Sequence, residues 1–135
     1  MAKLEDLLID AQEMDQELVA GILSPMLRID KQSCTIRPQS AWRNVSNEVR
    51  ILSYLLARKA MRALHLPLER EEAPPAEIIA ATGIPAGSVY PSLKGLYERR
   101  PQLVDKDASS RYSVPPWAVD VACQYIQSQL HSQGA

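Results

Sequence analysis

The chain has 135 residues, of which 46% are apolar and 23% charged, and its formal net charge is −1. These values fit one compact globular domain with appendages, and they argue against two independent cores and against a disordered chain. Because the chain contains no Phe, the core depends on Leu, Ile, Val, Ala and Met, which favours helices over sheet.

Enzyme, metal and membrane signals are weak throughout the sequence. Cys34 and Cys123 lie far apart and not at metal-ligand spacing, so we expect reduced thiols rather than a zinc site or a disulfide. His65 and His131 are isolated, and we find neither a Gly-rich phosphate loop nor a nucleophile elbow. The acidic N-terminus and the lack of 18 uninterrupted apolar residues predict neither export nor membrane insertion. We therefore expect a cytoplasmic protein with no catalytic residue, no metal site and no cofactor.

Charge is distributed unevenly along the chain. Residues 1–27 hold one Lys and six acids, a net charge of −5, whereas residues 28–65 hold eight Lys or Arg and two acids, a net charge of +6. This segregation has two interpretations: the oppositely charged segments pair within the molecule, or the basic segment binds a polyanion.

The first predicted helix has apolar residues at alternating intervals of three and four, and it ends near 21–25. These residues are Leu4, Leu7, Ala11, Met14 and Leu18. Such a seam faces another helix. It is explained either by one apolar face lying on the domain or by a dimer contact. In the next segment, Ile29, Thr35 and the break at Pro38 indicate a short extended or hairpin segment.

A central helix is predicted over 46–64, with Ser46 or Asn47 as the N-cap and Glu48 in its first turn. We expect it to be contacted on two sides. Its main apolar face consists of Val49, Leu52, Leu56, Ala60, Met61 and Leu64. A smaller second face holds Ile51 and Leu55 beside Arg58 and Arg62. Residues 65–75 read as a charged linker that ends in two prolines.

A short helix over 75–82 is predicted to end at Gly83, because a left-handed residue after a helix is favourable for Gly. The helix that follows buries Val89, Leu93 and Leu96. Pro91 is tolerable if regular helix starts only near 88–89, and it should kink a helix that starts at Ala86. Residues 103–114 have the pattern of two short antiparallel strands joined by a charged loop.

The last predicted helix has Pro116 at its first position, where the missing N–H costs nothing. Its expected buried stripe is Trp117, Val121, Ala122, Tyr125, Ile126 and Leu130.

A helix, a Gly turn, a second helix and a small hairpin together resemble the winged helix-turn-helix module of MarR-like and TrmB-like transcriptional regulators. The residues that carry the resemblance are Glu77, Ile78, Ile79, Ala80, Thr82, Gly83, Ile84, Val89, Leu93, Leu96 and the wing 103–114. It covers about residues 46–116, so we expect a mainly α fold with a small β-wing. The expected parts are an N-terminal helix and extended segment (1–45, a possible dimerisation element), a winged helix-turn-helix core (46–116) and a C-terminal helix (117–135).

The resemblance implies that the helix after the turn lies in the DNA major groove and that the wing contacts backbone or minor groove. On this basis Gly87 allows close backbone approach, Ser88 and Tyr90 donate hydrogen bonds, and Lys94 meets a phosphate or a guanine. The further implied contacts to phosphates are Arg99, Lys106, Arg111, Arg58 and Arg62. A solvated surface charge is the competing explanation for each of these cations.

The function predicted from this resemblance is double-stranded DNA binding by a transcriptional regulator that forms a homodimer through its terminal helices. Against it, the outward positions of the second helix lack Arg, Asn and Gln, the residues that best read bases. Residues 46–116 hold ten basic and eight acidic residues, a net charge of only +2. The alternative is a non-enzymatic winged helix that docks a protein partner through Tyr90 and Pro91.

Overall fold

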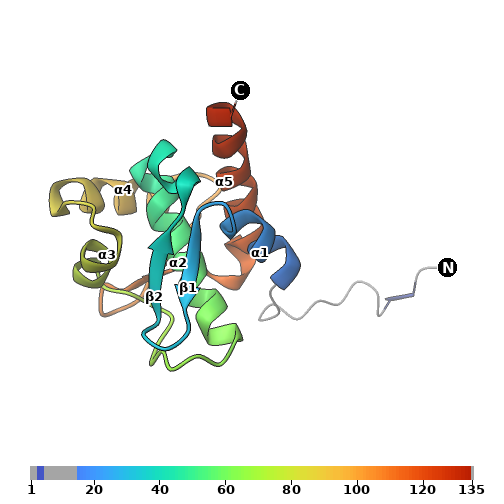
Figure 1. Ribbon diagram of the computed structural model, residues 1–135, viewed down its shortest axis with the longest axis horizontal. Helices are drawn as coiled ribbons and strands as arrows, with labels where there is room; N and C mark the ends of the chain where they lie inside the picture. The colour runs from blue at the N-terminus through green and yellow to red at the C-terminus, as the bar shows by residue number, and fades with distance from the viewer. Residues whose placement is uncertain (1–2, 5–14, 135) are drawn as a thin grey trace.

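The computed structural model is mainly helical, and its described residues form two small antiparallel sheets. Figure 1 shows the helices arranged around the hairpin of β1 and β2. The structure describes residues 3–4 and 15–134, with side chains as far as Leu130. One helix, α2 (Asn47–Ala63), lies at the centre. Four others contact it: α1 (Gln16–Leu23), α3 (Pro75–Thr82), α4 (Ala86–Glu98) and α5 (Val119–Gly134). The mainly helical class predicted from the sequence is therefore confirmed.

The central helix is more enclosed than its sequence pattern predicts. The Ser46 side chain caps its first turn by accepting a hydrogen bond from the Val49 amide at 3.3 Å, as expected. Every residue from Ile51 to Arg58 is buried, so neighbours surround this helix rather than contacting two sides of it. The expected burial of Leu64 is wrong: the helix ends at Ala63, and the Leu64 side chain is 58% exposed.

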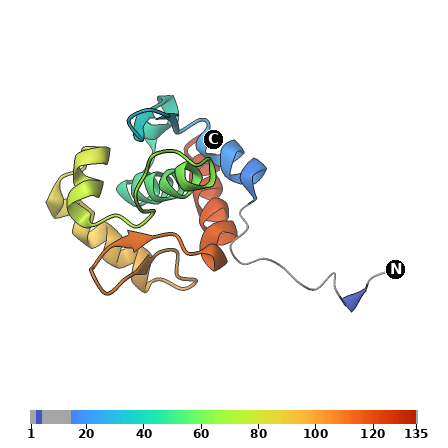
Figure 2. The same ribbon diagram turned by 90° about the horizontal axis from the view of Figure 1, so that it is seen from below.

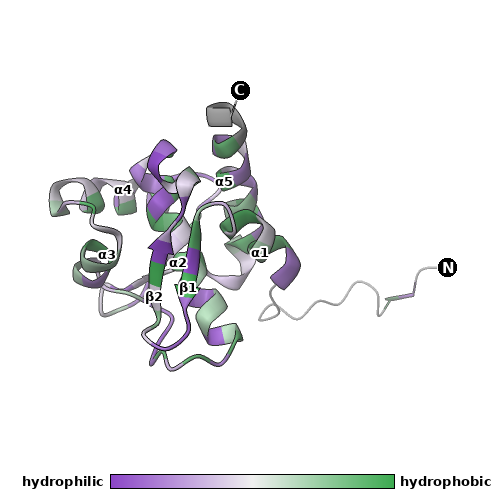
Figure 3. Cartoon of the chain, in the orientation of Figure 1, coloured by the Kyte–Doolittle hydropathy of each residue, from purple (hydrophilic) through white to green (hydrophobic). Residues whose placement is uncertain are grey.

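Of the two structures expected after the first helix, an extended segment or a hairpin, the structure shows the hairpin: β1 (Leu27–Asp30) pairs with β2 (Thr35–Pro38). Hydrophobic and hydrophilic colours alternate along the strands in Figure 3, and Leu27 and Ile36 face the core. Asp30 closes the loop by accepting hydrogen bonds from the amides of Gln32 and Ser33. These amides, followed by Arg37, lower the pKa of the Asp30 carboxyl.

The helix α1 begins at Gln16, where the Asp15 side chain caps it by accepting a hydrogen bond from the Leu18 amide at 3.0 Å. Of the predicted apolar seam, Leu4 is 82% exposed and Leu18 is half-buried. The remaining seam positions, Leu7, Ala11 and Met14, lie outside the described residues. The helix ends at Leu23, within the predicted range.

The linker between α2 and α3 is held by Arg58, a buried side chain of the central helix. Its guanidinium donates hydrogen bonds to the backbone carbonyls of Arg70 (2.8 Å), Glu71 (2.8 Å) and Glu72 (3.1 Å). It also lies 3.4 Å from the Glu77 carboxylate at the start of α3. A segment without hydrophobic periodicity is thereby fixed to the core.

The same linker pairs with the wing, the hairpin formed by β3 (Asp105–Lys106) and β4 (Tyr112–Ser113). Buried Ala73 forms an antiparallel bridge with Tyr112, with N–H···O distances of 2.8 and 2.9 Å. The hairpin predicted over 103–114 is thus present, with strands shorter than its sequence pattern indicates. In Figure 2 this hairpin and the hairpin β1–β2 lie on opposite sides of α2.

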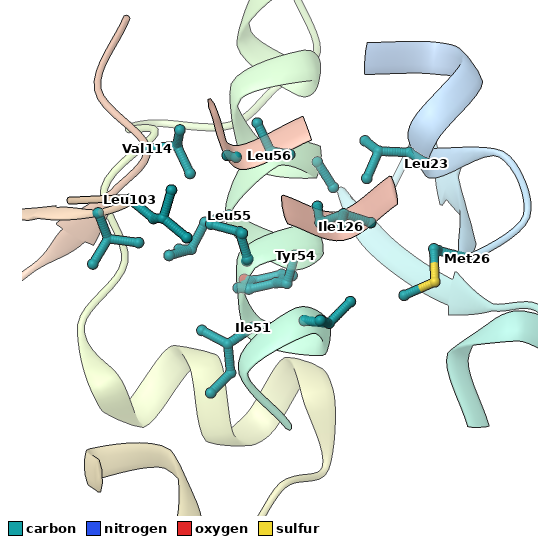
Figure 4. Packing of buried hydrophobic residues seen from close by; sticks show 14 of the residues in the cluster. Leu23, Met26, Ile51, Tyr54, Leu55, Leu56, Leu103, Val114 and Ile126 are labelled. Carbon is teal, nitrogen blue, oxygen red and sulfur yellow. The ribbon is translucent and has the colours of Figure 1, made fainter. Parts of the chain in front are cut away.

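One hydrophobic core joins the N-terminal, central and C-terminal segments. Figure 4 shows Leu23 and Met26 on one side of α2 and Leu103 and Val114 on the other. From α5, Ile126 completes this core.

The predicted stripe of the last helix is partly wrong. Trp117 is 61% exposed. It lies in a 3-10 turn (Pro116–Ala118) before α5 begins, so it does not follow the helical period that places Ala122 and Ile126 inside.

We expect the two thiols to differ sharply in reactivity. Cys123 is buried, and this burial raises the pKa of its thiol to about 11, with a smaller effect from Asp120. Cys34 is only half-buried, in the β1–β2 loop. Since the thiolate is the reactive form, a thiol reagent at pH 8 should modify Cys34 in the native protein and Cys123 only after unfolding. Equal rates of modification in native protein, followed by absorbance, would contradict this.

The raised pKa of Cys123 also affects stability in alkali. The thiol of an unfolded cysteine has a pKa of about 8.5, so between that pH and about 11 folded Cys123 keeps a proton that the unfolded state has lost. The free energy of unfolding that the protonated Cys123 thiol contributes is therefore fully present below pH ~8.5, and it is lost as the pH rises toward about 11.

Candidate nucleic-acid interface

The exposed side of α4 is fixed by a turn against α3. Gly83 ends α3 in the left-handed conformation, with φ of 74°, as its position in the sequence predicts. Thr82 stabilises the turn, since its hydroxyl donates to the Ile78 carbonyl at 2.6 Å and accepts from the Ile84 amide at 3.3 Å. The residues of α4 expected to face the core are all buried: Val89, Leu93 and Leu96. The opposite side of α4 is therefore presented to solvent.

Most of the residues predicted to point outward from α4 do so. Gly87 and Lys94 are exposed, and Tyr90 is 58% exposed, whereas Ser88 is half-buried. The Ser88 carbonyl accepts a hydrogen bond from the Ser92 hydroxyl at 2.7 Å. The outward stripe thus contains a glycine, a tyrosine and a lysine at helical spacing.

Pro91 lies inside α4, because the helix begins at Ala86 rather than near 88–89. A proline has no N–H, so the Gly87 carbonyl has no donor at its usual i+4 position. Pro91 is exposed, and the loss of this hydrogen bond therefore falls on the solvent side of the helix.

The wing continues this exposed stripe. The Lys106 ammonium of β3 lies 5.6 Å from the centre of the Tyr97 ring, which is 37% exposed on α4. Tyr90, Lys94 and Tyr97 follow one another at i, i+4 and i+7, so they share one face of the helix. We call Gly87, Tyr90, Lys94, Tyr97 and Lys106 the α4–wing face.

Arg111, the other predicted wing contact, already has a partner in the wing. Its guanidinium lies 2.9 Å from the Asp107 carboxylate. The same carboxylate accepts hydrogen bonds at 2.9 Å from the backbone amides of Ser109 and Arg111. Arg111 thus pairs with Asp107 within the loop of the wing, whereas Lys106 is the wing cation that contacts α4.

Three other predicted contacts have partners elsewhere in the fold. Arg58 is 5% exposed and holds linker carbonyls, so its guanidinium cannot reach a phosphate at the surface. Arg62 donates to the Leu68 carbonyl at 2.8 Å, at the linker end of α2. Arg99 stacks on the Tyr125 ring of α5 at 4.2 Å. Of the nine residues predicted to bind DNA, the structure brings Gly87, Tyr90, Lys94 and Lys106 onto one face.

Tyr97 and Ala73 are missed by sequence reasoning. Tyr97 had a detectable signal, because it lies seven residues after Tyr90 on the same helical face. Ala73 had none, since one alanine in a charged, proline-flanked linker does not indicate a strand.

Gly87 has room for a methyl group: a Cβ placed there meets no other atom within 4 Å. We expect Gly87→Ala to raise the free energy of unfolding by about 0.5–1 kcal/mol, since Gly is unfavourable inside a helix. If the backbone approaches DNA closely here, the same change lowers DNA affinity severalfold, as measured by fluorescence anisotropy.

Gly21→Ala in α1 is the matched control for Gly87→Ala, because Gly21 also has open space around it. It should stabilise the protein without changing DNA affinity. Equal affinities for both variants would rule out close backbone approach at Gly87.

Among the residues that the structure describes, no three His, Cys, Asp or Glu side chains are grouped so that they could hold a metal ion. None of the helices in the described part of the chain has the length and hydrophobicity needed to cross a membrane. Comparisons with protein-family models, curated proteins and solved structures gave no match to this chain.

Proposed function

We propose that this protein binds double-stranded DNA through the α4–wing face, in the manner of the winged helix-turn-helix transcriptional regulators that its sequence resembles. The observation that carries the proposal is the contact between a stripe of α4 and a cation of the wing. Tyr90, Lys94 and Tyr97 share one face of α4, and the Lys106 ammonium lies 5.6 Å from the centre of the Tyr97 ring. This arrangement suits a helix inserted in a groove with a flanking cation on the phosphate backbone.

The anchoring of the wing supports the proposal. Tyr112 pairs with Ala73, and the linker that contains Ala73 is held by Arg58. The wing is thus tied to the core through the linker as well as through its own ends. Two DNA contacts on separate elements benefit from such a fixed spacing, because ordering them costs less entropy on binding.

The chemistry of the face favours shape and backbone recognition over base reading. Tyrosine hydroxyls and lysine ammonium groups bond phosphates readily, whereas the face has none of the bidentate Arg, Asn or Gln contacts that specify bases. With two lysines on phosphates, log affinity should fall against log salt with a slope of about −2.

The test is fluorescence anisotropy of a labelled mixed-sequence duplex, titrated with protein across a salt series. Binding with a slope near −2 supports the proposal. No binding at low ionic strength would overturn it.

A protein-docking function is the second candidate, favoured by the composition of the same face. Tyr90 is 58% exposed beside exposed Pro91, and tyrosine is enriched at protein interfaces. Absence of DNA binding at low salt would favour this function over the first.

A further inference from the structure

An open apolar pocket of about 300 Å³ lies between α1, the hairpin β1–β2 and the end of α2, away from the α4–wing face. Its apolar lining is Val19, Ala20, Leu23, Leu27, Ile29, Ala60, Ala63 and Leu64. The Leu64 side chain at its edge is 58% exposed. We call this the α1–β1 pocket.

Arg28 lines the same pocket and gives it a positive edge. On the hairpin, Arg28 is directly opposite Arg37, and like charges at such a pair of positions repel. Asp30 lies 3.3 Å from Arg37, whereas Arg28 has no carboxylate partner within the described part of the chain and donates instead to the carbonyls of Ser24 and Leu27. An apolar surface with an exposed arginine at its edge fits an acidic amphipathic segment.

The chain itself contains such a segment. Residues 4–14 carry four acids and no Lys or Arg, with apolar residues at 4, 7, 11 and 14. This spacing gives a helix one apolar face, and the acids are Glu5, Asp6, Asp10 and Glu13. Its pattern matches the pocket in both charge and hydrophobicity.

Chain geometry favours a second copy as the donor of this segment. Gln16, the first residue of α1, already lines the pocket, and Asp15 caps that helix. To cover its own pocket the segment would have to reverse direction just before Asp15. A reversal between helices takes about 2–5 residues, which leaves about 6–9 of the 11 residues, or about two helical turns, for the pocket. The segment of another molecule has no such constraint.

We propose that the α1–β1 pocket binds the acidic segment 4–14 of a second copy of this chain, so that two copies exchange segments in a symmetric dimer. A two-fold axis satisfies both pockets at once, because each copy contributes one pocket and one segment. The proposal does not depend on DNA binding.

The first test is sedimentation equilibrium of the full chain with two matched variants. Leu64→Glu places a negative charge at the pocket edge. Trp117→Glu is the control, because it places the same charge at an apolar residue that is equally exposed but lies outside the pocket. We expect the wild type and Trp117→Glu to dimerise alike, and Leu64→Glu to raise the dimer dissociation constant at least tenfold. A monomeric wild type at 200 µM (about 3 mg/ml), or equal effects of the two variants, would overturn the proposal.

Cross-linking between copies then identifies the occupant. One copy carries Leu7→Cys and a larger, tagged copy carries Ala63→Cys, both with Cys34→Ser. Under mild oxidation we expect a mixed disulfide between the tagged and untagged chains. Absence of this product overturns the proposal. A single chain that carries both cysteines provides the second check. If it forms an internal disulfide and remains monomeric, its own segment fills the pocket and the proposal is overturned.

Discussion

Replacing Arg58 with methionine should lower the free energy of unfolding by about 3 kcal/mol, measured by urea denaturation. The change leaves three linker carbonyls, those of Arg70, Glu71 and Glu72, without their donor. It also removes the cation beside Glu77. Losing one partner of a buried charged network costs about 3–5 kcal/mol, and the partly exposed linker places this site at the lower end of that range.

Arg62→Met is the control for Arg58→Met, because Arg62 donates to the Leu68 carbonyl from an exposed position. It should cost less than about 1 kcal/mol. Arg58→Lys should recover only part of the loss, since an ammonium cannot match the fork that serves several carbonyls. If Arg58→Met and Arg62→Met were equally stable, the linker would not depend on the buried guanidinium.

The double substitution Lys94→Glu, Lys106→Glu should reduce DNA affinity at least tenfold at low ionic strength. Both ammonium groups lie on the α4–wing face, and each is expected to neutralise one phosphate. Their loss should bring the salt slope close to zero, because each phosphate contact contributes about 0.9 to it. Fluorescence anisotropy over a salt series measures both quantities.

The matched control is Lys31→Glu, Arg70→Glu, which changes the net charge by the same amount. Lys31 lies in the β1–β2 loop and Arg70 in the linker, both exposed and outside the α4–wing face. This variant should retain nearly all of the affinity. Equal losses in the two double variants would mean that overall charge governs binding and that α4 has no special part.

Local signals predicted the elements around the candidate site well. The cap at Ser46, the left-handed Gly83 and the three buried positions of α4 depend on interactions within a few residues, which sequence displays directly. The outward positions followed from the inward ones by helical geometry.

The failures have long-range causes. Arg58 lies on a helix face that the sequence pattern left partly open, and only the folded linker covers that face. The stacking of Arg99 on Tyr125 of α5 is likewise not indicated by the sequence pattern, and the phosphate contact expected of Arg99 stays a prediction. Trp117 is exposed because the 3-10 turn that precedes α5 breaks the helical period that the sequence pattern indicates. In each case, the residue contacts a segment that is remote in sequence, or the helix type changes at that residue.

The anchored linker determines where foreign sequence can be inserted into this chain. Residues 70–73 look expendable by composition, yet their backbone is bonded to Arg58 and to the wing, so an insertion there would break the connection that the linker makes between the wing and the core. The loop after Asp30 is exposed at Lys31, Gln32 and Ser33 and lies outside the core. The hydrogen bonds of that loop stay within the hairpin, from the amides of Gln32 and Ser33 to Asp30, so an affinity tag inserted there would leave the connection between linker and wing intact.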